Sequence, residues 1–210
     1  IDTLRADIEK EFERIRDGAL KLPKADIDAI ASWFAPPDLP TLPAASPELE
    51  QARRTSKAFD RWVRHNTHPH RSQGHAIVTV SLKPAGGPPG DATDRQMDLL
   101  ADLAERYSRD ELRISHEQNV ILPHVALGNL KAVHEALADE DLATGNGGLV
   151  TDIIACPGLD YCALANARSI PVAQRLSEAF GASGREEEIG ELKIKISGCI
   201  NACGHHHVGH

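Results

Sequence analysis

All four cysteines of this 210-residue chain lie in two short segments in its C-terminal third. Cys156 and Cys162 form a C-x5-C pair, and Cys199 and Cys203 form a C-x3-C pair. Clustered thiolates are the usual ligands of an iron–sulfur cluster, so this spacing indicates a metal centre. Any fold of the chain must then bring the two segments together around one site.

Three other interpretations of the cysteines remain open on spacing alone. A structural zinc site also uses four thiolates, but zinc modules usually repeat a spacing of two to four residues, and the first pair here is wider. Two disulfides would need an oxidising compartment, and no apolar signal sequence opens the chain. Four unrelated buried cysteines would leave the clustering unexplained. We therefore favour iron–sulfur over zinc or disulfides.

The composition is that of a globular protein, with 41% hydrophobic and 26% charged residues. The net charge of −8 argues against general nucleic-acid binding, which needs a basic surface. No apolar run is long enough to cross a membrane, and we expect a cytoplasmic protein. The chain begins at Ile1 and ends soon after Cys203, so we interpret it as part of a longer protein.

Residues 1–52 are predicted to form a helical and proline-rich connecting arm. Apolar residues recur at helical spacing over 3–17, and a second short helix is expected over 25–34. Prolines over 35–43 prevent that helix from continuing. Such an arm has little core of its own, so we expect part of its apolar stripe to be exposed.

Residues 53–145 are predicted to form an α+β half-domain. A basic segment over 53–71, with six Arg and Lys residues against Asp60 alone, is either an anion-binding surface or a solvated helix face. A strand is expected over 75–82, followed by a helix over 93–107 with Thr93 as its N-cap and Met97, Leu100 and Leu103 inward. Strands over 112–115 and 119–123 and a helix over 127–137 follow. The order is β-α-β-β-α.

Residues 146–210 are predicted to form a second α/β domain, incomplete at its end, that carries the cysteines. Strands over 149–155 and 192–197 each lead directly into a cysteine pair, and open α/β sheets place ligands at such strand ends. A helix is expected over 163–180, kinked or split at Pro171. Lys193 and Lys195 alternate with the apolar face of a strand, where solvation is the simpler interpretation.

Four segments resemble the siroheme-containing sulfite and nitrite reductases. The two most specific are Ala-Cys156-Pro-Gly-Leu-Asp-Tyr-Cys162-Ala-Leu-Ala and Ile-Ser-Gly-Cys199-Ile-Asn-Ala-Cys203-Gly. Glu-Leu-Arg113-Ile-Ser-His-Glu-Gln118-Asn119-Val and His68-Pro-His-Arg71-Ser-Gln73-Gly74 support them. Such reductases are tandems of two related halves, and these segments match the second half. The resemblance implies a ferredoxin-like half-domain followed by an iron–sulfur and siroheme domain, with the first half absent.

The resemblance also implies the ligands of both cofactors. Cys156, Cys162, Cys199 and Cys203 would hold a 4Fe-4S cluster, and Cys203 would also bridge to the siroheme iron as the catalytic thiolate. Asn201, Gly204, Arg113 and Asn119 are the further cofactor-binding candidates, although Arg113 and Asn119 serve a structural role equally well. For His205, His206, His207 and His210 we prefer contacts around the cofactor to a separate metal site, because successive side chains diverge.

The implied reaction is the six-electron reduction of sulfite to sulfide, with nitrite reduction to ammonia as the alternative. The basic residues that bind the substrate would come mainly from the absent first half. Electrons would come from a separate ferredoxin or NADPH flavoprotein, because the glycine-rich stretch Gly86–Gly90 carries prolines where a dinucleotide site needs amides. A non-catalytic iron–sulfur or zinc domain is the alternative of a different class.

Overall fold

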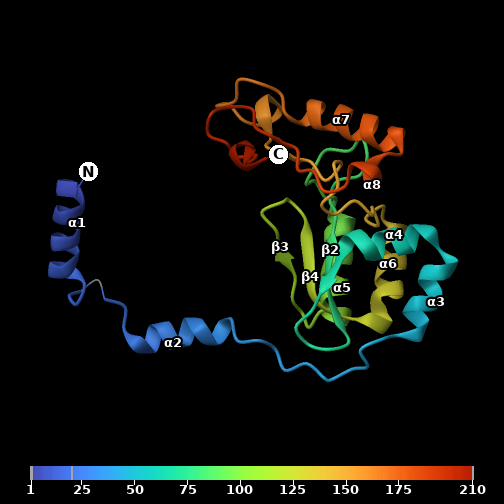
Figure 1. The fold of residues 1–210 in the computed structure, drawn as a ribbon, viewed down its shortest axis with the longest axis horizontal. Coiled ribbons are helices and arrows are strands. Elements are labelled where there is room, and N and C mark those ends of the chain that lie inside the picture. The colour runs from blue at the N-terminus through green and yellow to red at the C-terminus, as the bar shows by residue number, and fades with distance from the viewer. Residues whose placement is uncertain (1, 20, 210) are drawn as a thin grey trace. The chain divides into compact units, whose positions relative to one another are not determined.

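The computed structural model describes residues 2–19 and 21–209, and it divides into two compact units at Pro40 (Figure 1). The first unit holds helices α1 (Asp2–Ile15) and α2 (Lys24–Trp33), which confirms the two helices expected in the arm. None of the described residues of α1 or α2 is buried. Leu4, Ile8 and Phe12 form the apolar stripe of α1, and all three are exposed, as expected.

Two helices that precede the sheet belong to the second unit. Helix α3 (Pro47–Thr55) begins at the N-cap Ser46, and helix α4 (Lys57–Asn66) begins at the N-cap Ser56; each serine hydroxyl accepts a backbone N–H of the first turn. Leu49 and Ala52 of α3 are buried in the core of the half-domain. The boundary expected at residue 52 therefore falls inside a packed helix, and the structure divides the chain at Pro40 instead.

A four-stranded antiparallel sheet forms the centre of the half-domain. Its strands are β1 (Thr67–Pro69), β2 (His75–Val80), β3 (Arg113–Ile114) and β4 (Val120–Ala126), in the order β1-β2-β4-β3. Helix α5 (Asp94–Tyr107) connects β2 to β3, and helix α6 (Leu130–Asp139) follows β4 after the short 3-10 turn Leu127–Asn129. The predicted β-α-β-β-α order is confirmed from β2 to α6, and β1 is a further strand that precedes it. Helices α4 and α5 contact the sheet, and α3 packs against α4 and α6 (Figure 1).

The core of the half-domain lies between the sheet and these helices. Its fully buried members include Trp62 of α4, Val78 of β2, Leu122 of β4 and Leu137 of α6. Thr93 and Gln96 form a complete capping box at the start of α5, as the expected N-cap implied. Met97 was expected to face inward but is 62% exposed, because the buried face of α5 is made by Leu100, Leu103 and Ala104 one turn further on.

The C-terminal part of the second unit carries the cysteines on short elements. Strands β5 (Ile154–Ala155) and β6 (Lys195–Ile196) pair in parallel and are much shorter than the strands expected there. Helix α7 (Ile170–Ser183) has Pro171 in its first turn and is not kinked by it. Proline fits there because the N–H groups of the first turn have no hydrogen-bond acceptor within the helix. Helix α8 (Glu186–Ile189) follows, and Ile153, Ala155 and Ala173 form a small second core.

Three arginines of the basic segment over 53–71 form ion pairs within the second unit. Arg53 pairs with Asp60 at 2.8 Å, Arg61 with Glu186 at 2.6 Å and Arg64 with Glu187 at 3.0 Å. Glu186 and Glu187 belong to α8, so the arginines of α4 attach the cysteine-bearing part to the half-domain. In the ranges that the structure describes, no helix is long and apolar enough to cross a membrane.

Candidate metal centre

The parallel pairing of β5 and β6 brings the two cysteine segments together. Ile154 pairs with Lys195 and Ala155 with Ile196, so both strands run in the same direction and end at the same edge. The backbone N–H of Cys156 donates to the Ile196 carbonyl at 3.0 Å, which extends the ladder by one residue. Cys156 thus directly follows β5 and lies next to the segment that connects β6 to Cys199. The sequence-based expectation that a strand delivers each cysteine pair is confirmed.

Cys156 has the most enclosed thiol of the four. It is 6% exposed, and the backbone N–H of Gly198 donates to its Sγ at 3.0 Å. The Ser169 hydroxyl lies 3.4 Å from the same sulfur and donates to the Cys156 carbonyl at 2.6 Å. Burial acts to raise the pKa of this thiol, but the hydrogen bonds from Ser169 and from backbone N–H groups outweigh burial and lower the pKa below its usual value.

The other three cysteines become progressively more open to solvent. Cys162 and Cys199 are half-buried, Cys203 is exposed, and all four are free thiols. Cys162 closes a tight loop by donating its N–H to the Gly158 carbonyl at 2.8 Å. Among the described residues, no group of three or more His, Cys, Asp or Glu side chains converges on a single metal-ion position. Among the described residues, the four thiols therefore do not converge on one metal-ion position.

Two glycines allow the cysteine segments to pack closely. A Cβ on Gly204 would overlap the carbonyl oxygen of Ile196, and a Cβ on Gly198 would lie 2.7 Å from the carbonyl oxygen of Ala167. The backbone N–H groups of Asn166 and Ala167 donate to the Gly198 carbonyl at 2.8 and 3.1 Å. These contacts fix the segment that holds Cys199 and Cys203 against the loop that follows Cys162.

The structure places the remaining predicted cofactor-binding residues in different surroundings. Gly204 is buried and Asn201 is exposed, both beside Cys203. Arg113 is exposed on β3, and its guanidinium pairs with Glu111 at 2.5 Å. Asn119 is 1% exposed, and its side chain accepts from the Leu82 N–H at 3.2 Å and donates to Asp152 at 3.1 Å. The side-chain amide of Asn119 is therefore already hydrogen-bonded within the protein. Of the two candidates Arg113 and Asn119, only Arg113 is accessible.

The two lysines before the second cysteine pair also differ from each other. Lys193 forms an ion pair with Glu117, and this carboxylate raises the pKa of Lys193. Lys195 lies on β6 and is half-buried. His205, His206 and His207 are exposed, and the rings of His206 and His207 lie 4.0 Å apart between centroids. His210 lies outside the described residues.

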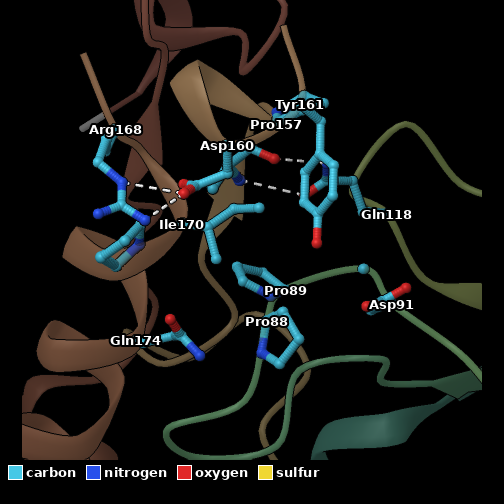
Figure 2. A pocket seen from close by; sticks show the side chains of 13 residues that line it. Pro88, Pro89, Asp91, Gln118, Pro157, Asp160, Tyr161, Arg168, Ile170 and Gln174 are labelled. Carbon is cyan, nitrogen blue, oxygen red and sulfur yellow. Dashed lines mark hydrogen bonds and ion pairs between the residues drawn. The ribbon is translucent and has the colours of Figure 1, made fainter.

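A cavity of about 670 Å³ adjoins the loop between Cys156 and Cys162 (Figure 2). Its walls come from that loop, from the turn at Pro88 and Pro89, from the start of α7 and from Gln118. Asp160 is held in its wall by Arg168, whose Nε donates to it at 2.9 Å. Gln118 reaches across to the backbone of Ala155, a contact between segments distant in sequence that sequence patterns alone do not reveal.

Comparison with known proteins identifies the class to which this fold and these segments belong. Residues 70–140 match the family described as the nitrite/sulfite reductase ferredoxin-like half-domain. The match covers strands β2, β3 and β4 and the helices α5 and α6. The second unit therefore contains a ferredoxin-like half-domain.

The relatives extend the match into the cysteine-bearing part. The chain is 28% identical over 165 residues to the chloroplastic ferredoxin–nitrite reductase of Zea mays, covering 74% of this chain and 27% of that protein. It is 32% identical over 122 residues to the NADPH sulfite reductase hemoprotein beta-component of a Methylobacterium species, covering 56% of this chain and 19% of that protein. The chain is thus similar to sulfite and nitrite reductases, and it spans about a quarter of the length of the Zea mays nitrite reductase.

A solved structure shows the same fold. The Mycobacterium tuberculosis NirA protein superimposes with a TM-score of 0.53 at 20% sequence identity, covering 67% of this chain and 25% of that one. This likeness confirms the fold class, and the family model and the relatives support the resemblance stated from the sequence motifs.

Proposed function

We propose that this chain is the cluster-binding part of a larger reductase, in which Cys156, Cys162, Cys199 and Cys203 hold a 4Fe-4S cluster coupled to siroheme. The observation that carries the proposal is the parallel pairing of β5 and β6, because it brings both cysteine segments to one edge of the same small sheet. The similarity of the chain to sulfite and nitrite reductases supports the same cofactors.

The residues present fit such a group. All four donors are free thiols, which match the sulfur-rich coordination of iron in these clusters. Gly198 and Gly204 remove side chains where the two cysteine segments pack most closely. The exposure of Cys203 suits the thiolate that would be shared with the siroheme iron, because a second group can approach it from outside.

The protein groups would tune and orient these ligands. The Gly198 N–H donates to the Cys156 sulfur and stabilises its thiolate form. Gly204 and Asn201 are the candidates for contacts around Cys203, and Arg113 is the accessible cation on the adjacent hairpin. When bound, the cluster and siroheme would pass electrons from an external donor to the anion, one at a time. Asn119 would act through its buried hydrogen bonds, because its amide is already engaged.

Nitrite and sulfite are the two candidate substrates, and each accepts six electrons at a centre of this kind. Relatives named ferredoxin–nitrite reductases, from Zea mays and Synechococcus elongatus for example, favour nitrite and a ferredoxin as electron donor. The relative named as an NADPH sulfite reductase component keeps sulfite and a flavoprotein donor as the second candidate. The sequence-based preference for sulfite receives no support from these names.

Metal analysis after anaerobic reconstitution with iron and sulfide tests the cluster. We expect about four irons per chain and a broad visible absorption that bleaches on reduction. Stoichiometric zinc without iron would contradict the proposal and favour the zinc-structural alternative. Steady-state rates on nitrite and on sulfite with the whole reductase then decide the substrate. The isolated chain should reduce neither anion at a useful rate, because the basic residues expected from the other half are needed to bind a charged substrate.

A further inference from the structure

Gln118 makes an unusual contact with the strand that ends at Cys156. Its side-chain Nε2 donates to the Ala155 carbonyl at 2.8 Å, and its Oε1 accepts the Ala155 N–H at 3.1 Å. One side-chain amide therefore satisfies both backbone polar groups of a single residue, as a neighbouring strand would. Ala155 is 3% exposed, so these two groups have no access to water that could replace the amide.

The contact is needed because β5 has a partner on one side only. The N–H groups of Ile154 and Cys156 donate to the carbonyls of Ile194 and Ile196 on the β6 side, both at 3.0 Å. In an extended strand, the N–H and C=O of the intervening Ala155 point the opposite way. Gln118 occupies that open edge, directly before the first cysteine.

The loop that carries Gln118 is held in a special conformation. Gln118 has a backbone φ of +58°, in the left-handed region that residues with a Cβ rarely adopt. The Ser115 hydroxyl accepts the N–H groups of Glu117 and Asn119, each at 3.2 Å, and the Gln118 N–H donates to the Ser115 carbonyl at 3.1 Å. The rigid loop fixes the direction of the Gln118 side chain.

The neighbours of Gln118 hold the same part of the molecule. Glu117 pairs with Lys193, which precedes β6, and Asn119 donates to Asp152, which precedes β5. Three consecutive residues of the half-domain thus contact β5 itself or the residues that precede β5 and β6. Only Gln118 acts on the residue adjacent to a cysteine.

We propose that Gln118 is a positioning residue for Cys156: its amide fixes the end of β5 and thereby sets where this thiolate lies in the cluster site. The proposal rests on the proposed function, because a positioning role has meaning only if Cys156 binds the cluster. It predicts that weakening the contact raises the reactivity of Cys156 selectively in the chain without cofactor. In the reconstituted chain, the same change should alter the cluster that Cys156 would bind.

The variant Gln118→Asn isolates the side-chain contact. Asparagine tolerates a positive φ at least as well as glutamine, but it is one methylene shorter and cannot span the same distance to Ala155. Gln118→Glu keeps an acceptor for the Ala155 N–H and loses the donor to its carbonyl, so its effects should be intermediate. Gln96→Asn is the matched control. Gln96 lies in the first turn of α5, and its side-chain amide also makes two hydrogen bonds to backbone groups, those of Thr93 and Glu140.

The first measurement is the rate of alkylation of each cysteine by iodoacetamide in the reduced chain without metal, followed by peptide mass spectrometry. Cys203 serves as an internal reference because it is already exposed. We expect Gln118→Asn to raise the Cys156-to-Cys203 rate ratio about tenfold, since two hydrogen bonds that hold the strand closed are lost, and Gln96→Asn to leave it unchanged.

The second measurement is the electron paramagnetic resonance spectrum and iron content of the reduced, reconstituted chain. We expect Gln118→Asn to shift the g-values or lower the iron content, with the wild-type spectrum in Gln96→Asn. A Gln118→Asn chain with the wild-type rate ratio, spectrum and iron content would overturn the proposal. If the wild-type chain binds no iron, the proposed function fails and the cluster role of Gln118 fails with it, while the alkylation ratio still reports whether Gln118 holds Cys156 closed.

Discussion

Lys83 and Asp152 form an ion pair in which both side chains are almost completely removed from water. Their N–O distance is 2.5 Å, and the side chains are 2% and 5% exposed. Lys83 follows β2 in the half-domain, and Asp152 precedes β5 in the cysteine-bearing part. Asn119 and the Gly148 N–H also donate to Asp152, at 3.1 and 2.9 Å. The pair therefore connects the two parts at the point where the chain turns toward Cys156.

Replacing Asp152 by asparagine should destabilise the second unit by about 3–5 kcal/mol, because Lys83 would be left as a buried charge without its counter-ion. Burial already lowers the pKa of Lys83, and the Asp152 carboxylate opposes that shift. Urea denaturation followed by circular dichroism measures the loss. Lys131→Met, which removes an exposed pair with Glu135 on α6, should cost less than about 1 kcal/mol. Equal losses in the two variants would show that the buried pair has no special role.

A methyl group at Gly204 should disturb the second cysteine pair. Its Cβ would overlap the Ile196 carbonyl oxygen, so the backbone around Cys203 must move, at a cost of about 1–3 kcal/mol. We expect Gly204→Ala to bind markedly less iron on anaerobic reconstitution. Gly128→Ala is the control, because a Cβ there meets no atom within 4 Å. Wild-type iron content in Gly204→Ala would contradict the close packing described here.

Cys203 should differ from the other cysteines in its effect on haem. In the whole reductase, Cys203→Ser is expected to shift the siroheme absorption even where some iron–sulfur is retained, because this thiolate would be shared between the two cofactors. Cys156→Ser should act on haem only through loss of the cluster. Optical spectra and iron-to-haem ratios of both variants distinguish the two cases, and identical spectra would assign the shared thiolate to another residue.

Mild acid should destabilise the half-domain through His134. Its ring packs edge-on against Phe59 and Trp62, each at 5.1 Å between centroids. Burial lowers the pKa of His134, with Lys131 acting in the same direction and Glu135 opposing it. The folded state then binds fewer protons than the unfolded state, so stability falls as the pH drops below about 6.5 toward the lower folded-state pKa.

His134→Phe keeps an aromatic ring in place but cannot take up a proton. Between about pH 7.5 and about pH 5.5, this variant should lose less unfolding free energy than the wild type. His68→Phe provides the comparison, because His68 is an exposed histidine of the same half-domain. Urea denaturation at several pH values gives the measurement. Parallel stability–pH curves for wild type and His134→Phe would exclude this histidine as a cause.

Local sequence signals determined the elements of this chain. Each of these signals depends on residues close together in the chain: the apolar periodicity over 3–17 and 93–107, the N-cap Thr93 and the β-branched run at 75–82. The two helices and the strand form where these signals predict them. The order β-α-β-β-α and the strand before each cysteine pair followed from the same signals. The cysteine spacing likewise pointed to the candidate metal centre.

The tertiary structure decided which side chains meet. Whether Met97 faces the core depends on where α5 rests on its neighbours, and the boundary at Pro40 depends on α3 packing into the half-domain. The contact of Gln118 with Ala155 spans 37 positions and that of Lys83 with Asp152 spans 69. Such pairs leave no periodic signal in the sequence, because each depends on how the strands pair and how the loops are held in space, whereas a helix or a cap is determined by neighbours along the chain.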